Sequence, residues 1–165
     1  MSEAQNLGHA EKQYDKIGGW LILVAIGLII TPVRLIVFIL TDLLTAFSPE
    51  NWHLLTTPGT EAYHPLWAPI LIFELVGNFM FFLFSIIVAI YFFQRDKIAP
   101  KMIIIFLLSN LIFVAVDYFI GNLIPFVRDL NNTQSTNELI RIVIGCLIWV
   151  PYFLMSKRVK GTFVH

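Results

Sequence analysis

Four long apolar segments constrain the fold of this chain more than any other feature. They run over residues 17–40, 66–93, 100–127 and 139–155, approximately. A membrane-spanning helix needs about 20 apolar residues, and each segment comes close to or exceeds that length. Apolar residues make up 58% of the chain and charged residues only 13%, well below the share in a soluble domain. The sequence therefore predicts an all-α, four-transmembrane-helix bundle in which residues 1–165 form a single integral membrane domain.

Lysine and arginine gather on one side of these segments. They are Lys12, Lys16, Arg95, Lys97, Lys101, Lys157, Arg158 and Lys160. The loops on the other side contain Arg128 alone. Because positive residues mark the cytoplasmic side of a membrane protein, we expect both termini to be cytoplasmic (N-in and C-in).

Short signals at the segment ends support these boundaries. Ser48-Pro49-Glu50 has the order of an N-cap, a first-turn proline and an acid matched to the helix dipole, which predicts a short surface helix in the first outer loop. Pro100 suits the first turn of the third helix. Ser135 and Glu138 have the spacing of a capping box at the start of the fourth helix.

Ionisable residues occur within or beside all four segments: Arg34, Glu74, Asp117 and Arg141. A rise of about 1.5 Å per residue puts the first three roughly 12–15 Å below the outer surface, with Arg141 nearer that surface. Isolated charges at this depth are costly, so they are expected to meet one another or to line a wet cavity. A guanidinium can bind two carboxylates at once, and the sequence therefore predicts a buried Arg/Glu/Asp cluster.

Helical spacing adds two amides to this cluster. Asn78 follows Glu74 by one turn, and Asn110 precedes Asp117 by two turns on the same helix face. The predicted ligand or relay cluster is Arg34, Glu74, Asn78, Asn110, Asp117 and Arg141. One interpretation is an ion-pair network that holds the helices in register, with the amides bonding between helices. Another is a proton or ion relay, or an anion site formed by the two arginines.

Other chemistry finds little support in the sequence. All histidines lie outside the apolar segments, and no phosphate-binding glycine loop or nucleophile motif is present. Cys146 has no histidine near it in sequence and is interpreted as a packing residue. Formal net charge is zero, so a nucleic-acid partner is not expected. We expect no catalytic residue, no metal site and no cofactor.

Three short motifs resemble those of a known family. They are Gly18-Gly19-Trp20-Leu21, then Trp67-x-Pro69 followed by Glu74, Asn78 and Asp117, and finally Tyr152-x-x-x-Ser156-x-Arg158-Val159-Lys160-x-Thr162-Phe163. Together they resemble the YdgK-like family of small bacterial inner-membrane proteins, which is a domain of unknown function. The resemblance implies a four-span protein of the bacterial inner (plasma) membrane. It adds weight to six residues, namely Gly19, Trp20, Glu74, Asp117, Arg158 and Lys160. It implies no activity.

Two functions from different classes follow as expectations. The first is a non-enzymatic accessory or interaction protein, held in the lipid bilayer, that works with a membrane-protein partner or as a homo-oligomer. The alternative is a small proton- or ion-coupled transporter or channel that uses the charged cluster.

Overall fold

The computed structural model describes residues 16–130 and 134–164, which contain helices and no β-strand. The elements are α2 (Trp20–Phe38), the π-helical turn η1 (Ile39–Leu43), α3 (Leu44–Ala46), α4 (Pro49–Thr56), α5 (Trp67–Phe93), α6 (Ala99–Gly121), α7 (Pro125–Leu130), α8 (Gln134–Met155) and α9 (Lys157–Thr162). Among the described residues, four helical segments are long and apolar enough to cross a membrane: Trp20–Ala46, Trp67–Phe93, Ala99–Gly121 and Ser135–Met155. The predicted all-α fold with four such helices is confirmed.

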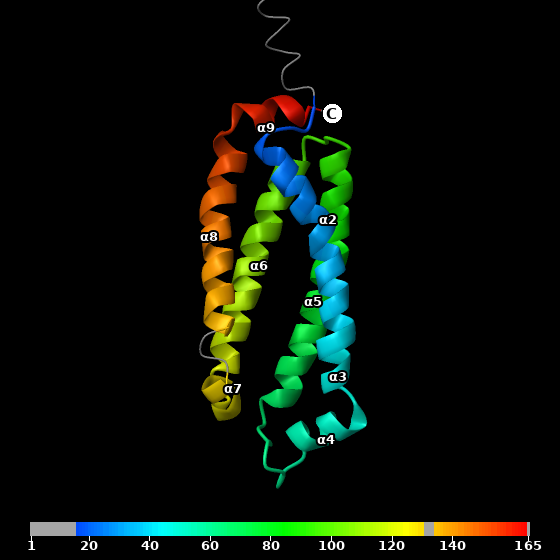
Figure 1. The fold of residues 1–165 in the computed structure, drawn as a ribbon, viewed down its shortest axis with the longest axis vertical. Helices are drawn as coiled ribbons and strands as arrows, with labels where there is room; N and C mark the ends of the chain where they lie inside the picture. The colour runs from blue at the N-terminus through cyan, green and yellow to red at the C-terminus, as the bar shows by residue number, and fades with distance from the viewer. Residues whose placement is uncertain (1–15, 131–133, 165) are drawn as a thin grey trace, which may run out of the picture.

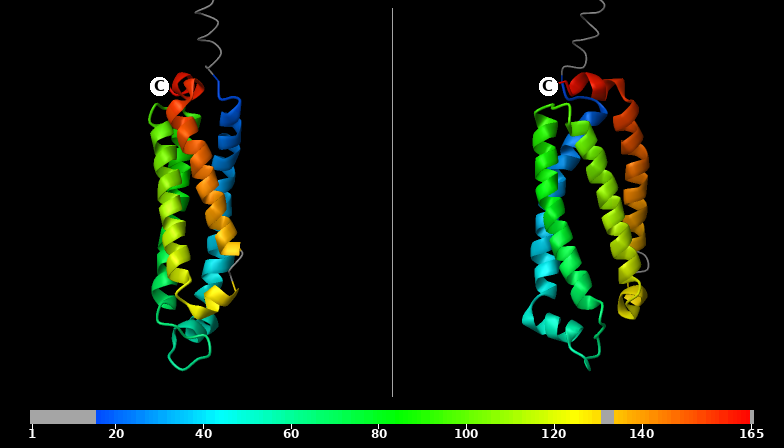
Figure 2. Two further views of the ribbon diagram at one scale, coloured as in Figure 1. Left: turned by 90° about the vertical axis from the view of Figure 1, so that its left-hand side faces the viewer. Right: turned by 180° about the vertical axis from the view of Figure 1, so that it is seen from behind.

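The long helices run up and down the molecule as two pairs (Figure 1). Helix α2 packs along α5, α6 packs along α8, and α5 and α6 join the two pairs. The start of α2, the α5–α6 turn and helix α9 lie at one end, while α4 and α7 lie at the other, as all three views show (Figures 1 and 2). Helices α2 and α8 are therefore the two edges that do not pack along one another.

The apolar core extends from α9 to the middle of the bundle. Its buried members are Leu21, Leu28, Val88, Phe92, Ala99, Ile103, Phe106, Phe153, Val159 and Phe163. Helix α9 crosses this end and buries Val159, and the ring of Phe163 just after it lies 5.3 Å from that of Phe92. We call the end with α9 the closed end, and the end with α4 and α7 the open end.

Two predicted local signals are present. The Ser48 side chain caps α4 by accepting the backbone N–H of Asn51 at 3.4 Å, with Pro49 in the first turn. Pro100 lies in the first turn of α6. A short helix therefore forms in the first loop, and its position on a membrane surface stays a prediction.

Helix ends differ from the expected positions at three places. The first helix continues past residue 40 to Ala46, through a π-helical turn in which the Thr41 hydroxyl donates to the Val37 carbonyl at 2.9 Å. The third helix ends at Gly121 instead of 127, because tight turns lead to Pro125 and a separate helix α7. Helix α8 begins at Gln134, so Glu138 lies inside the helix and not in a capping box.

Candidate functional site: an acidic cavity at the open end

The two helix pairs diverge toward the open end and leave two adjoining cavities of about 320 and 430 Å³. Phe38, Glu74, Val114, Asp117 and Glu138 line both of them. Because these walls are shared, the two spaces form one region between α2, α5, α6 and α8. We call it the acidic cavity. Its size is in the range of small-ligand sites.

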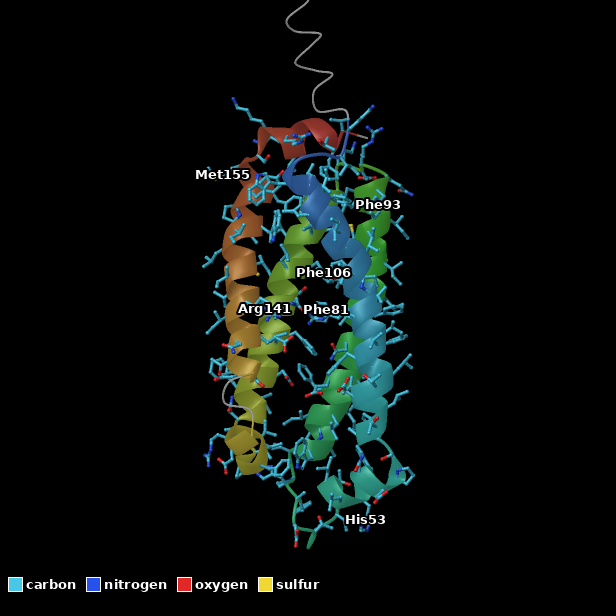
Figure 3. All side chains as sticks on the ribbon, viewed as in Figure 1. His53, Phe81, Phe93, Phe106, Arg141 and Met155 are labelled. Carbon is cyan, nitrogen blue, oxygen red and sulfur yellow. The ribbon has the colours of Figure 1, made fainter. Side chains whose placement is uncertain are left out.

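Phenylalanine rings fill the space between α5 and α6 on the closed-end side of the acidic cavity. The ring of Phe81 lies 5.8 Å from Phe106 and 5.2 Å from Phe113. Figure 3 shows Phe81 and Phe106 between the helix pairs at mid-height. Phe113 also lines the cavity. The rings therefore separate the polar region from the apolar core at the closed end.

Glu74 on α5 and Asp117 on α6 form the centre of the acidic cavity. Their carboxyl groups face each other within hydrogen-bonding distance, and Glu138 is close enough to Asp117 to repel it. The Asn78 amide donates to the backbone carbonyl of Glu74 at 2.8 Å, so it bonds within its own helix and not between helices. Two carboxyl groups in contact can share a proton or hold a cation between them.

The position of Arg34 corrects the predicted buried Arg/Glu/Asp cluster, which is not seen. Its Nη2 atom lies 3.3 Å from Oε1 of Glu138, and the two side chains are 72% and 49% exposed. Arg34 lines the acidic cavity, but its partner is on α8 and is neither Glu74 nor Asp117. The physical reason is that α8 begins early enough to present Glu138 toward α2, while α2 and α6 diverge at this level.

Two other predicted site residues lie elsewhere. Asn110 is half-buried on α6, and Arg141 is exposed on α8 (Figure 3). Neither lines the acidic cavity, and neither has a hydrogen bond or ion pair with residues in the described ranges. The structure thus brings Arg34, Glu74, Asn78 and Asp117 to one cavity and leaves Asn110 and Arg141 outside it. An anion site shared by Arg34 and Arg141 has no support in this geometry.

Sequence reasoning missed two carboxylates of the acidic cavity, Asp42 and Glu138. Asp42 was expected in a loop, but the π-helical turn η1 extends the helix through it. Oδ2 of Asp42 lies 2.5 Å from the hydroxyl oxygen of Thr41, so it competes with the Val37 carbonyl for the single hydroxyl proton. π-Helical turns recur at functional sites, yet no simple pattern in the sequence predicts one. For Glu138 a signal was present, because it lies one turn before Arg141 on a helical face.

Acidic side chains outnumber basic ones around the acidic cavity. Four carboxyl groups (Asp42, Glu74, Asp117 and Glu138) and one guanidinium, that of Arg34, line it. Within the part of the chain that the structure describes, no three His, Cys, Asp or Glu side chains are grouped closely enough to hold a metal ion. The carboxylates are therefore spread around the wall. Such a lining favours water and a positively charged organic group over an anion.

Comparisons with known proteins give one match. The family model described as "Protein of unknown function (DUF2569)" matches residues 14–164. No curated protein and no solved structure matches the chain. The finer resemblance to YdgK-like proteins stays a prediction.

Proposed function

Because the chain belongs to this protein family, whose function is unknown, we propose its function from the acidic cavity. The protein is a non-enzymatic accessory protein of the membrane that receives a positively charged group of a partner membrane protein in this cavity. The observation that carries the proposal is that four carboxyl groups and only one arginine line the space between the helix pairs. A cationic side chain entering there is stabilised, because it can pair with Glu74 and Asp117, which lack a basic partner of their own among the described residues.

The orientation belongs to the same proposal. We place both termini in the cytoplasm of a bacterium and the acidic cavity toward the outer side of its inner membrane. The basic residues of the closed end support this, since Lys97, Lys101, Lys157 and Lys160 all lie there. Helix α4 then lies near the outer surface, with Trp52 and Phe47 stacked 5.1 Å apart at interfacial depth.

Photo-crosslinking from the cavity wall tests the partner proposal. A photoreactive amino acid at Val114, which lines both parts of the acidic cavity, is expected to give a discrete adduct in native membranes. The adduct should weaken strongly when Glu74→Gln and Asp117→Asn are combined, because the cationic group then loses its counter-charges. Adducts are quantified by immunoblot against the amount of protein and identified by mass spectrometry.

Ile112 provides the matched control for this experiment. It lies on the same helix, is 64% exposed and does not line the acidic cavity, so the same probe there should give no charge-dependent adduct. An adduct at Val114 that persists unchanged after both carboxylates are neutralised would rule out the proposed recognition. So would the absence of any discrete adduct.

The contact between Glu74 and Asp117 favours a second candidate, a proton- or cation-coupled transporter or channel. Facing carboxyl groups on two helices, reached from a polar cavity, have the chemistry of a relay. On this reading the phenylalanine rings between α5 and α6 form the barrier toward the closed end. Where a single four-helix bundle is too small to enclose a path for protons or cations, an oligomer provides that path between its subunits.

Flux measurements in proteoliposomes test the relay. Glu74→Gln is expected to abolish proton or monovalent-cation uptake while the protein remains monodisperse, because the relay loses its ionisable group. Glu50→Gln removes the same charge from α4, away from the acidic cavity, and should leave uptake unchanged. Failure of the wild-type protein to carry protons, sodium or potassium would contradict the second candidate and leave the partner proposal standing.

A further inference from the structure

A separate feature lies at the closed end, where Arg158 of α9 packs against the start of α2. A Cβ atom added to Gly19 would lie 2.9 Å from Nη1 of Arg158, and one added to Gly18 would collide with Nη2. The guanidinium therefore rests directly on the Gly18–Gly19 backbone. This contact joins two motifs that are separated by more than a hundred residues in sequence, and the acidic cavity does not involve either of them.

Among the residues that the structure describes, Arg158 has no counter-charge. Its Nε atom is buried without a hydrogen-bond partner, and no ion pair joins the guanidinium to any residue of the described ranges. Helix α2 begins beside it without a side-chain cap. The N–H groups of Leu21 and Ile22 bond to the carbonyls of Gly18 and Gly19, and the dipole of the helix puts partial positive charge at the same place. Lys157 and Lys160 flank it on α9 and are exposed. An anion at this position would pair with the guanidinium and accept a hydrogen bond from its Nε–H, which has no partner among the described residues.

An apolar groove lies farther along α2 toward the middle of the bundle, and its lining begins at Leu23. It has a volume of about 150 Å³ and is lined by α2, α6 and α8, including Leu23, Gly27, Phe106, Trp149 and Phe153. It lies between α2 and α8, the two helices that do not pack along one another. Leu23 is about one helical turn from Gly19, and the rings of Trp20 and Trp149 meet edge-on at 6.3 Å near the same level.

We propose that the closed end binds an anionic phospholipid, with its phosphate on Arg158 beside Gly18 and Gly19 and one acyl chain in the groove between α2 and α8. Charge complementarity selects this occupant: the site is cationic at one end and apolar along the rest. Trp20, which is 63% exposed, has the amphipathic ring that favours the boundary between headgroup and chain. A free phosphate would use only the cationic part, whereas a lipid without a phosphate group would use only the groove.

Native mass spectrometry of the delipidated protein in detergent tests the headgroup part. Wild-type protein is expected to bind phosphatidylglycerol about tenfold more tightly than phosphatidylcholine, because phosphatidylglycerol has a net negative charge, whereas the choline ammonium of phosphatidylcholine offsets its phosphate and is repelled by Arg158, Lys157 and Lys160. Arg158→Gln should remove this preference. Arg128→Gln, which deletes an exposed arginine at the open end, should keep it.

Gly27→Leu tests the groove independently of Arg158. Nothing lies within 4 Å of a Cβ added at Gly27, so the leucine fits the fold and fills the groove instead. Phosphatidylglycerol affinity should fall several-fold. Gly145→Leu is the matched control, since Gly145 has the same free space and lies outside the groove, and it should bind as wild type does.

Three results overturn the proposal: equal affinity for the two lipids, unchanged binding in Gly27→Leu, or competition by glycerol phosphate as effective as that by phosphatidylglycerol. Effective competition by glycerol phosphate would mean that the site binds the anion alone and does not bind the acyl chain of a lipid. If Arg158→Gln does not fold, Arg158→Lys keeps the charge but loses the planar group, and a reduced preference in that variant supports the proposal while full preference contradicts it.

Discussion

Replacing Gly77 by alanine is expected to destabilise the bundle by about 1–3 kcal/mol, the usual cost of overpacking a well-filled interface. An added Cβ would fall on Cε2 and Cζ of Phe113, closer than any real contact. The ring has little freedom to move aside, because Phe73 lies 4.8 Å from it and Phe81 lies 5.2 Å from it. The loss should appear as a lower temperature at which the detergent-purified protein ceases to be monodisperse.

Gly145→Ala is the control for this prediction. It makes the same change on α8, where nothing lies within 4 Å of the new Cβ, and should be neutral or stabilising by up to about 1 kcal/mol through helix propensity. Adding Phe113→Leu to Gly77→Ala should recover part of the loss, since a smaller side chain leaves room for the methyl group. Equal stability of the two alanine variants would show that α5 and α6 do not pack as described.

Gly77 also connects the packing of the bundle to the acidic cavity. Phe113 belongs both to the ring array between α5 and α6 and to the cavity wall. A close approach of the two helices at Gly77 is what allows Glu74 and Asp117, one turn away on each helix, to face each other. The carboxyl contact therefore depends on a residue with no side chain, whose role no motif in the sequence indicated.

The four long apolar helices were predictable because each is determined by a continuous stretch of the sequence and not by contacts between distant residues. Length and hydropathy decide whether a segment can cross a bilayer, and local caps such as Ser48 depend on adjacent residues only. A common level was predictable for the same reason: counting residues from the segment ends put Arg34, Glu74 and Asp117 at one height, and all three line the same cavity. Their depth in a membrane stays a prediction.

Partner choice was not predictable, because it depends on how the helices rotate and diverge. Arg34 pairs with Glu138. Predicting this ion pair from the sequence would require knowing that α8 begins at Gln134 and that α2 separates from α6. Asp42 joins the cavity only because a π-helical turn adds a residue and changes the face of the helix. Arg141 was predicted in the cluster but is exposed on α8 and lies outside the cavity, because the rotation of α8 about its axis cannot be counted along the sequence.

The motif residues at the two ends of the chain acquire a structural role that the family resemblance did not supply. Gly18, Gly19 and Arg158 meet at the closed end, and Val159, Thr162 and Phe163 bury their side chains beside them. The first and last motifs thus form one contact surface. Its conformational requirement is strongest at Gly19, where φ is 58° and ψ is −135°, a region that essentially only glycine adopts.

Gly19→Ala is therefore expected to destabilise the protein by several kcal/mol, through two separate effects. The backbone conformation costs about 1–3 kcal/mol for a residue with a Cβ, and the methyl group presses on the Arg158 guanidinium. Arg158→Ala removes only the second effect. Thermal stability should thus fall in Gly19→Ala, recover partly in the double variant, and remain below that of Arg158→Ala alone by the cost of the backbone strain. A double variant as stable as Arg158→Ala would mean that the backbone at Gly19 is not strained, whereas no recovery would mean that α9 does not press on α2 at this point.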